Sequence, residues 1–437
     1  MKSSIKSLVK KVVPSFLFPI IGGWKERRKD TLIEKCEDNY RKALEKLRNK
    51  QPIKCVFLVV SDSAWKYDGV YKRMITDPRF EPVILACPIV NNGRKNMLNR
   101  LEECYSYFQS KGYNVIKSYN VNNDTYLDLR KQLSPDILFY TNPYEGLIDE
   151  KYYITNYLDI LTVYVGYYFN ETADYNLACN QLLHNLVWRR YVETDEIKGY
   201  SLEYSKNKGK NAVVTGYPGI ENLIYHDNKT DDKCWKISDR NIKRIIWAPH
   251  HTIEAVGPVY YSCFLKYSDF MVQIAKKYRD KVQFVFKPHP LLKIRLYKVW
   301  GKEKTDEYYR QWSEMPNTAY KEGDYFDLFI TSDAMIHDSG SFLVEYLYVN
   351  KPVMRPINDV PLDKLYNKLG LKCLDNYYLA KSEEDIEEFV QNVINGNDPL
   401  KESRTEFVNN VLMPNNPPSQ NIIDDIIRSV EEQIVYP

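Results

Sequence analysis

Short apolar runs alternate with longer amphipathic stretches along most of the chain. The first clear run, residues 55–60, contains no polar side chain, which is typical of a strand buried on both faces. Helix-like spacing over 96–109 and 194–205 separates later runs. This alternation predicts an α/β fold with a parallel sheet covered by helices. The strands predicted in this half of the chain are 55–60, 83–86, 113–117, 136–140, 161–169, 186–192 and 211–215.

The same alternation restarts after a polar stretch near the middle of the chain. Residues 226–236 are mostly polar or charged, which indicates a linker between domains. The simplest architecture is two α/β domains with a cleft between them, and 437 residues fit that number. We expect a segment over 1–50, a first domain over 51–225 and a second domain over 237–437. In the second domain we predict strands over 244–247, 283–287, 328–331 and 334–336, and helices over 262–278, 294–312, 341–348 and 422–434.

Four of the six histidines directly follow three predicted strands of the second domain. They are His250, His251, His289 and His337. Parallel strands bring their carboxyl ends to one edge of a sheet, where open α/β sheets bind ligands, so we expect the four imidazoles to converge. Because neighbouring side chains of an extended chain point to opposite sides, only one of His250 and His251 is expected to face the cleft.

The residues around His289 favour a binding site. Pro288 and Pro290 restrict the backbone on both sides of the ring, and Lys287 can supply positive charge. A lone histidine is more often structural, but four at one predicted edge favour a functional site.

The segment from His337 to Ser341 is a second candidate for ligand binding. A predicted strand ends there in a turn of small residues, Asp338, Ser339, Gly340 and Ser341, and a helix follows. Free backbone N–H groups at such a helix start favour a phosphate, and Glu345 one turn later could accept hydrogen bonds from ribose hydroxyls. The alternative is that Asp338 and Ser339 only cap the helix, and the motif alone leaves both interpretations open.

Other common chemistries lack their sequence signatures. The imidazoles and Asp338 could ligate zinc, but no His-x-x-x-His or Cys-x-x-Cys spacing supports this, so we expect no metal site. The chain has no Gly-x-Ser-x-Gly elbow, no Walker A sequence and no Gly-x-Gly-x-x-Gly loop. We therefore expect no bound cofactor.

Composition narrows the class of protein. Hydrophobic residues make up 44% and charged residues 27%, as in globular proteins with a large core. The net charge of +3 is too small to indicate a protein that binds nucleic acid through a strongly positive electrostatic field. Eight scattered cysteines without metal-ligand spacing indicate reduced thiols in a cytoplasmic chain. The chain contains 37 tyrosines, and we expect most of their rings to pack in the core rather than to stack on a ligand.

The amino-terminal segment is basic and partly apolar. Residues 1–30 carry eight Lys and Arg residues against two acidic ones, around an apolar run over 12–21. The run is shorter than the roughly 20 residues that span a bilayer. Pro14 and Pro19 interrupt it and no cleavage site follows, which argues against a signal peptide. We expect a peripheral anchor at the inner face of the cell membrane, with a disordered or domain-packed tail as the alternative. A connecting helix is expected over 31–50.

Three motifs together resemble one known family. They are 247–251 (Trp-Ala-Pro-His-His), 287–290 (Lys-Pro-His-Pro) and 332–341 with Glu345, and they are similar to the CDP-glycerol glycerophosphotransferases of teichoic-acid and capsule synthesis. Gly-Tyr-Pro at 216–218 resembles that family's turn near the domain junction. The resemblance is best over 210–355.

The resemblance implies a fold, a reaction and roles for individual residues. The fold would be two Rossmann-like domains of the GT-B type, with the nucleotide held by the second. An acceptor hydroxyl would attack the β-phosphorus of CDP-glycerol, and CMP would leave. His289 would hydrogen-bond the pyrophosphate, residues 339–341 would cradle a phosphate, Glu345 would hold the ribose, and His250 or His251 would line the cleft.

The chain departs from the family pattern in the first domain. The family's polymerases carry a Trp-His-Gly-Thr-like motif whose histidine is the expected base, but the corresponding residues 164–168 contain no histidine. The base could instead be His250, His251 or an acidic group such as Glu145 or Glu171. His250, His251 and His289 are our candidate catalytic residues. Lys287, His289, His337, Asp338, Ser339, Gly340, Ser341 and Glu345 are our candidate donor-binding residues.

Three functions therefore stay open from the sequence. The first is transfer of glycerol phosphate, or a related polyol phosphate, from a CDP donor to a saccharide or lipid-linked acceptor. The second is a GT-B glycosyltransferase that uses a nucleotide sugar. The third is a non-catalytic glycan-binding protein, which the missing histidine of the first domain would favour.

Overall fold

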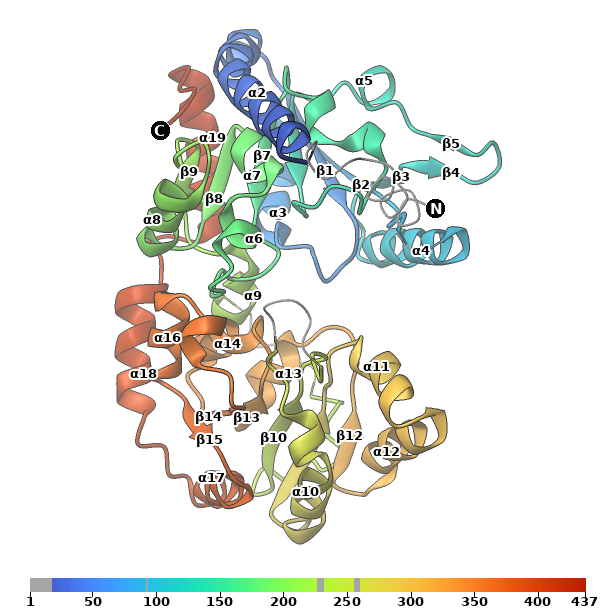
Figure 1. Ribbon diagram of the computed structural model, residues 1–437, viewed down its shortest axis with the longest axis vertical. Coiled ribbons are helices and arrows are strands. Elements are labelled where there is room, and N and C mark those ends of the chain that lie inside the picture. The colour runs from blue at the N-terminus through green and yellow to red at the C-terminus, as the bar shows by residue number, and fades with distance from the viewer. Residues whose placement is uncertain (1–17, 92, 226–231, 255–259) are drawn as a thin grey trace.

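The computed structural model describes residues 18–91, 93–225, 232–254 and 260–437, with side chains from residue 29 onward. Most of the basic segment predicted as a membrane anchor, and residues 226–231 of the predicted linker, lie outside the described residues. The described chain forms two lobes, each built on a parallel sheet (Figure 1). The two parallel α/β sheets confirm the predicted fold class.

The first lobe contains a seven-stranded parallel sheet in the order β3-β2-β1-β6-β7-β8-β9. Its central strands are almost entirely buried, as the apolar runs predict. The strands are β1 (Ile53–Val59), β2 (Phe80–Ala86), β3 (Val115–Lys117), β6 (Ile137–Tyr140), β7 (Leu161–Val165), β8 (Arg189–Val192) and β9 (Ala212–Val214). Around it lie α2 (Phe18–Leu47), α3 (Asp68–Thr76), α4 (Arg94–Ser110), α5 (Leu129–Gln132), α6 (Tyr175–Cys179), α7 (Leu182–Leu186), α8 (Asp195–Tyr204), α9 (Glu221–Ile224) and the small hairpin of β4 (Tyr119–Asn120) and β5 (Thr125–Tyr126).

The second lobe contains a six-stranded parallel sheet in the order β12-β11-β10-β13-β14-β15. The strand β10 lies between β11 and β13, so the three strands that precede the histidines are neighbours. The strands are β10 (Lys243–Ala248), β11 (Val282–Phe286), β12 (Thr318–Tyr320), β13 (Ala334–His337), β14 (Val353–Pro356) and β15 (Tyr378–Ala380). Its helices are α10 (Phe264–Lys277), α11 (Leu292–Val299), α12 (Lys302–Glu314), α13 (Phe326–Thr331), α14 (Phe342–Glu345), α15 (Leu362–Leu365), α16 (Lys368–Leu374), α17 (Glu383–Asn395) and α18 (Lys401–Phe407). A further helix, α19 (Pro418–Glu431), follows in the sequence.

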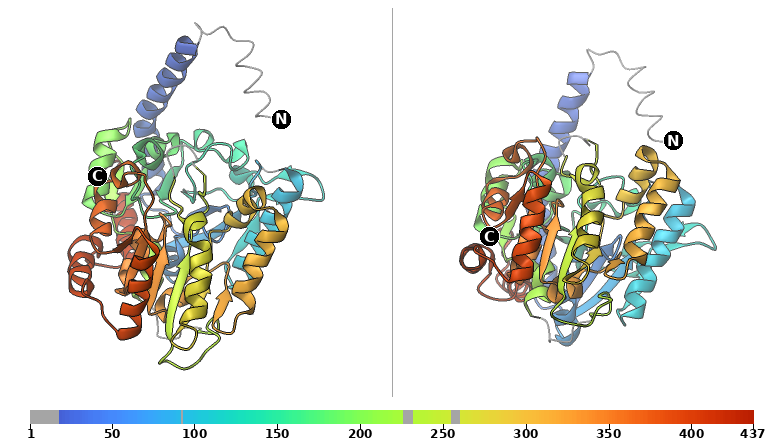
Figure 2. Two further views of the ribbon diagram at one scale, coloured as in Figure 1. Left: turned by 60° about the horizontal axis from the view of Figure 1, so that its bottom comes forward. Right: turned by 90° about the horizontal axis from the view of Figure 1, so that it is seen from below.

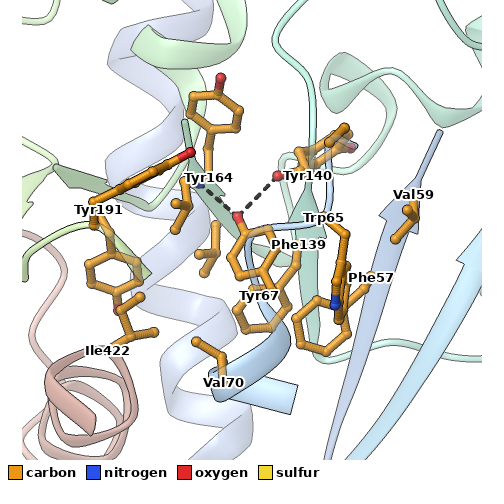
Figure 3. Close-up of a cluster of buried hydrophobic side chains, with 14 of the residues drawn as sticks. Phe57, Val59, Trp65, Tyr67, Val70, Phe139, Tyr140, Tyr164, Tyr191 and Ile422 are labelled. Atoms are coloured by element: carbon orange, nitrogen blue, oxygen red, sulfur yellow. Dashed lines mark hydrogen bonds between the residues drawn. The ribbon is translucent and has the colours of Figure 1, made fainter. Parts of the chain in front are cut away.

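Aromatic rings fill much of the first lobe's core, as the tyrosine content predicts. Phe57 stacks on Phe139 with ring centroids 4.3 Å apart, and Trp65 and Tyr67 pack edge-on against Phe57 (Figure 3). The buried Tyr67 hydroxyl donates to the Tyr140 carbonyl at 3.0 Å and accepts from the Val165 N–H at 2.7 Å. These bonds satisfy a hydroxyl that would otherwise be costly to bury.

The last helix of the chain does not stay with the second lobe. We expected 237–437 to form one domain, but α19 packs against α3 and lies beside the first sheet (Figure 1). The fully buried Arg189 of β8 forms an ion pair with Asp425 of α19 at 2.9 Å, and Tyr191 donates to the same carboxylate at 3.0 Å. An amphipathic pattern shows that a helix has an apolar face, but it does not show which core that face covers.

Two further differences concern helices. Residues 328–331, predicted as a strand, belong to α13, because a short apolar run does not distinguish a strand from a buried helix. The connecting helix expected over 31–50 begins earlier, at Phe18, and both views in Figure 2 show α2 projecting from the first lobe. None of the helices in the described part of the chain combines the length and apolar character needed to cross a membrane.

Candidate active site

Three histidine rings form a cluster at the carboxyl ends of β10 and β11. The ring centroids of His250 and His251 are 4.2 Å apart, and His289 lies 5.1 Å from the first and 4.2 Å from the second. The expectation that only one of the adjacent pair faces the cleft is therefore wrong. The chain turns directly after His250, where the Ile253 N–H donates to the His251 carbonyl at 2.9 Å, so the alternation of an extended strand does not apply.

Burial keeps these imidazoles neutral. Desolvation, with a contribution from the nearby Arg295, lowers the pKa of His251 to about 4 and that of His289 to about 3. Desolvation also lowers the pKa of His250 well below its usual range. The Leu291 N–H donates to His289 Nδ1 at 3.1 Å, so the neutral ring carries its proton on Nε2. His289 can therefore donate one hydrogen bond to a ligand, and a bound anion would favour protonation of all three rings.

His337 does not join the cluster. Its side chain is fully buried, and Nε2 lies 3.0 Å from the Tyr377 hydroxyl. The prediction that four imidazoles converge is therefore wrong for this residue. Successive side chains of an extended chain point to opposite sides. The Asp338 side chain reaches the His250 N–H, so the preceding His337 side chain points to the other side of the sheet.

Asp338 holds the backbone of the site in place. Its buried carboxylate accepts from the His250 N–H at 2.5 Å and from the Cys263 N–H at 2.6 Å. Burial raises the pKa of Asp338 to about 6, although these hydrogen bonds act in the opposite direction. Arg355 donates to the carbonyls of Asp338 and Ser339, at 3.0 and 3.2 Å. These contacts fix the 338–341 turn relative to the histidine cluster.

The turn does not start a long helix. The helix α14 covers four residues and continues as a single 3₁₀ segment, Tyr346–Val349, so its dipole is small. Ser341 occupies the N-cap position without a side-chain cap bond, and neither Asp338 nor Ser339 caps α14. The capping interpretation is therefore wrong, and a ligand at this turn would depend on local N–H groups and hydroxyls.

Glu345 lies next to a lysine of the first lobe. Its buried carboxylate accepts from the Tyr325 hydroxyl at 2.5 Å and lies 3.6 Å from the ammonium of Lys66. Lys66 comes from the first lobe and also donates to the Tyr325 hydroxyl at 3.2 Å. The sequence did not predict Lys66 or Tyr325, because neither belongs to a motif; Tyr325 reaches Glu345 within the second lobe, and Lys66 reaches it only through the packing of the two lobes.

Lys287 lies beside the same aromatic ring. Its ammonium is 5.9 Å from the centre of the Tyr325 ring and donates to the Gly323 carbonyl at 2.7 Å. Burial lowers the pKa of Lys287 to about 8, so the side chain still carries a positive charge at neutral pH. It is the cation that sequence analysis placed next to His289.

A loop of the first lobe reaches the 338–341 turn. The Asn367 N–H donates to the Glu171 carbonyl at 2.8 Å, and Thr172 pairs with Tyr366 in an antiparallel bridge. A Cβ atom added to Gly340 would lie 2.7 Å from Glu171 Oε1, so a larger residue there would push the Glu171 carboxyl group away. Candidate residues from both lobes therefore meet at Gly340.

The first lobe also has a polar pocket beside α2. Its volume is about 510 Å³, and amide side chains form much of its wall. A smaller cavity of about 20 Å³ shares Pro143 and Tyr144 with it and reaches Asn170. The pocket is lined by Lys29, Ile33, Pro143, Tyr144, Glu145, Asn176, Asn180, Gln181, Leu182, Asn185 and Lys206.

The histidine cluster is also a group that could hold a metal ion. The ligand atoms of His250, His251 and His289 lie within 4.8 Å of one another. Three imidazole nitrogens are a ligand set that zinc accepts, and the same three rings could also contact an oxyanion together.

Two facing parallel α/β lobes with a polar site at the strand ends define a GT-B-type protein. Solved structures with this fold match nearly the whole chain. MnaA of S. aureus, solved with UDP, is 14% identical (TM-score 0.55, 88% of this chain and 99% of that one). UDP-GlcNAc 2-epimerase from Neisseria meningitidis, bound to UDP-GlcNAc, is 16% identical (0.52, 86% and 99%). A histidine-to-alanine variant of the wall teichoic acid polymerase TagF is 13% identical (0.53, 95% and 96%).

The family match is more specific than the fold. Residues 197–410 match the model of the family described as CDP-glycerol:poly(glycerophosphate) glycerophosphotransferase. This confirms the resemblance seen in the motifs, and it makes the protein a transferase with a nucleotide-activated donor and an acceptor. The comparison with curated protein sequences finds no match.

Proposed function

We propose that the protein transfers glycerol phosphate, or a related polyol phosphate, from a CDP-activated donor to a saccharide or lipid-linked acceptor in cell-surface polysaccharide synthesis. The observation that carries this proposal is the cluster of His250, His251 and His289 at the strand ends of the second lobe. The cluster lies beside the 338–341 turn, to which Asp338 connects it. Such an arrangement suits a diphosphate that bridges a nucleoside and a small polyol.

The donor would occupy the strand ends of the second lobe. His289 Nε2 and the positive charge of Lys287 would contact the diphosphate, with His250 and His251 beside them. Ser339, Gly340 and Ser341 would surround one phosphate, and Asp338 and His337 would support this turn from behind. Glu345 would bind the ribose hydroxyls once they replace Lys66 and Tyr325 as its partners.

The acceptor would enter from the first lobe. The polar pocket beside α2 offers amide groups and the Tyr144 ring, which together suit the hydroxyls and apolar faces of a saccharide. The helix α2 leads from this pocket toward the basic amino-terminal residues, which we propose hold the enzyme at the inner face of the membrane. TagF, which shares the fold, is named as a wall teichoic acid polymerase, and this agrees with a cell-wall acceptor.

Calorimetric binding of CDP, UDP and CMP tests the donor site. We expect the wild type to prefer CDP, and His289→Ala to bind CDP at least tenfold more weakly, because a buried hydrogen bond to a charged group contributes about 1.5–3 kcal/mol. Lys298→Ala removes an exposed positive charge from the adjacent α11 and should leave CDP binding unchanged.

The other outcomes point to other functions. A preference for UDP would favour a glycosyltransferase that uses a nucleotide sugar. Unchanged CDP binding by His289→Ala would show that the donor does not occupy the histidine cluster. Analysis of the products formed from CDP-glycerol would then identify the transferred group.

A further inference from the structure

Glu171 is a buried acid that the donor site does not use. It follows β7, at the carboxyl edge of the first sheet, and its side chain is only 3% exposed. Its backbone is fixed to the second lobe through the Asn367 N–H and the bridge between Thr172 and Tyr366. The carboxyl group is therefore held at the point where the two lobes meet.

One oxygen of this carboxyl group reaches the phosphate turn. A Cβ atom on Gly340 would come within 2.7 Å of Oε1, so that oxygen already lies against the turn. The absence of a side chain at Gly340 is what lets the carboxyl group approach. Any phosphate bound at 339–341 would therefore lie close to Glu171.

The other oxygen, Oε2, is buried and has no hydrogen-bond partner among the described residues. Leaving a buried polar atom unsatisfied costs about 1–3 kcal/mol, and native proteins rarely do so without a function. A hydroxyl group that donates to Oε2 would remove this cost. The missing partner therefore indicates a ligand that carries a hydroxyl.

The other candidate bases are less well placed. Glu145 is exposed at the far pocket, and Glu193 Oε1 already accepts from the Asn170 N–H at 3.1 Å. The three clustered histidines lie on the donor side of the cleft, where the diphosphate would need them. Glu171 alone comes from the first lobe, where an acceptor would arrive, and still touches the phosphate turn.

We propose that Glu171 is the general base that activates the acceptor, an inference that rests on the proposed transferase function. The carboxylate would accept the proton of the acceptor hydroxyl as the hydroxyl oxygen bonds to the β-phosphorus of the donor. The bond from that phosphorus to the bridging oxygen breaks at the same time, and CMP leaves with the electron pair. The acceptor is thus a polyol or saccharide hydroxyl presented from the first lobe.

The surroundings of Glu171 suit a base that works near neutral pH. Desolvation is the main reason that the pKa of Glu171 rises to about 8, and Glu193 and Glu345 raise it further while Arg355 lowers it. A base with a pKa close to the working pH combines adequate ionisation with a strong tendency to accept a proton. The other titratable groups that face it are Tyr167, Tyr168, Tyr261, Tyr366 and Cys373.

Glu171→Gln tests this role, because glutamine keeps the shape but cannot accept the proton. We expect CMP release from CDP-glycerol, assayed with a panel of polyol and saccharide acceptors, to fall about 10²–10⁴-fold in kcat. Affinity for CDP should stay within twofold. Wild-type kcat should rise with pH up to about 8, and the residual activity of the variant should lose this dependence. Glu171→Asp should restore part of the activity.

Controls separate this role from a structural one. Glu196→Gln removes a carboxylate that pairs with Lys372 across the lobes at 2.8 Å, and it should leave turnover unchanged. A Glu171→Gln variant that turns over within a few-fold of the wild type, or that loses CDP binding as strongly as activity, would overturn the proposal. If the wild type itself released no CMP from CDP-glycerol, the proposed function would fail first, and the base assignment with it.

Discussion

Removing the Glu171 carboxyl group should stabilise the folded protein, by an amount that depends on pH. Burial raises the pKa of this group from 4.5 to about 8. Between these values the carboxyl group is protonated in the folded chain and ionised in the unfolded chain, so unfolding releases a proton. The stability of the wild type therefore falls as the pH rises through this window. Glutamine titrates in neither state, so the variant avoids this loss.

The size of the effect follows from the same two pKa values. One pKa unit corresponds to about 1.4 kcal/mol. Glu171→Gln should therefore match the wild type below pH 4.5, exceed its free energy of unfolding by about 3 kcal/mol at pH 7, and exceed it by about 5 kcal/mol above pH 8. The contribution of a buried acid that does not interact with Glu171, such as Asp338, is the same in both proteins and cancels in the difference.

Urea unfolding followed by tryptophan fluorescence at pH 5, 7 and 8.5 measures this difference. Glu196→Gln is the control, because this carboxyl group forms an ion pair near the surface and its removal should not produce a gain that grows with pH. A Glu171→Gln difference that stays constant from pH 5 to 8.5 would refute the reasoning, since it would show that the carboxyl group is not desolvated. Stabilisation together with lost turnover would show that the buried acid is kept for the reaction at the expense of stability.

Three other perturbations should have defined effects. Gly340→Ala should weaken CDP binding at least tenfold in calorimetry, because the added methyl group meets Glu171 and the Tyr261 ring, whereas Gly199→Ala meets open space and should not change binding. Arg189→Met leaves Asp425 buried without its main partner and should lower the free energy of unfolding by about 3–5 kcal/mol in urea titrations; a loss below 1 kcal/mol would show that the ion pair does not hold α19. Deleting residues 1–30 should release the protein from anionic vesicles in a sedimentation assay, and equal binding by the truncated protein would contradict the membrane anchor.

Much of the fold could be predicted from the pattern of apolar residues. The uninterrupted runs identified every strand of the first sheet and β10, β11 and β13 of the second. The short strands β12 and β15, at the two edges of the second sheet, were not predicted. Residues 328–331 are helical although the pattern predicts a strand, because four residues are too few to distinguish the two-residue repeat of a strand from the 3.6-residue repeat of an α-helix.

The site was partly predictable, for a topological reason. Parallel strands place their carboxyl ends together, so His289 could be grouped with His250 and His251 although it lies far from them in sequence. The prediction that His337 joins them is wrong, because successive side chains of a strand point to opposite faces of the sheet and the sequence did not show which face His337 would take. Contacts between the lobes, such as Lys66 with Glu345 and Glu171 with Gly340, depend on how two separately folded surfaces meet, and no local pattern encodes that.

The return of α19 to the first lobe has a consequence for how the protein is made. The amino-terminal lobe lacks one of its covering helices, and Arg189 lacks its buried partner, until α19 has been synthesised. During translation the second lobe can therefore assemble before the first one is complete. A ribosome that stalled before α19 was made would leave the earlier lobe, rather than the later one, exposed to aggregation and proteolysis.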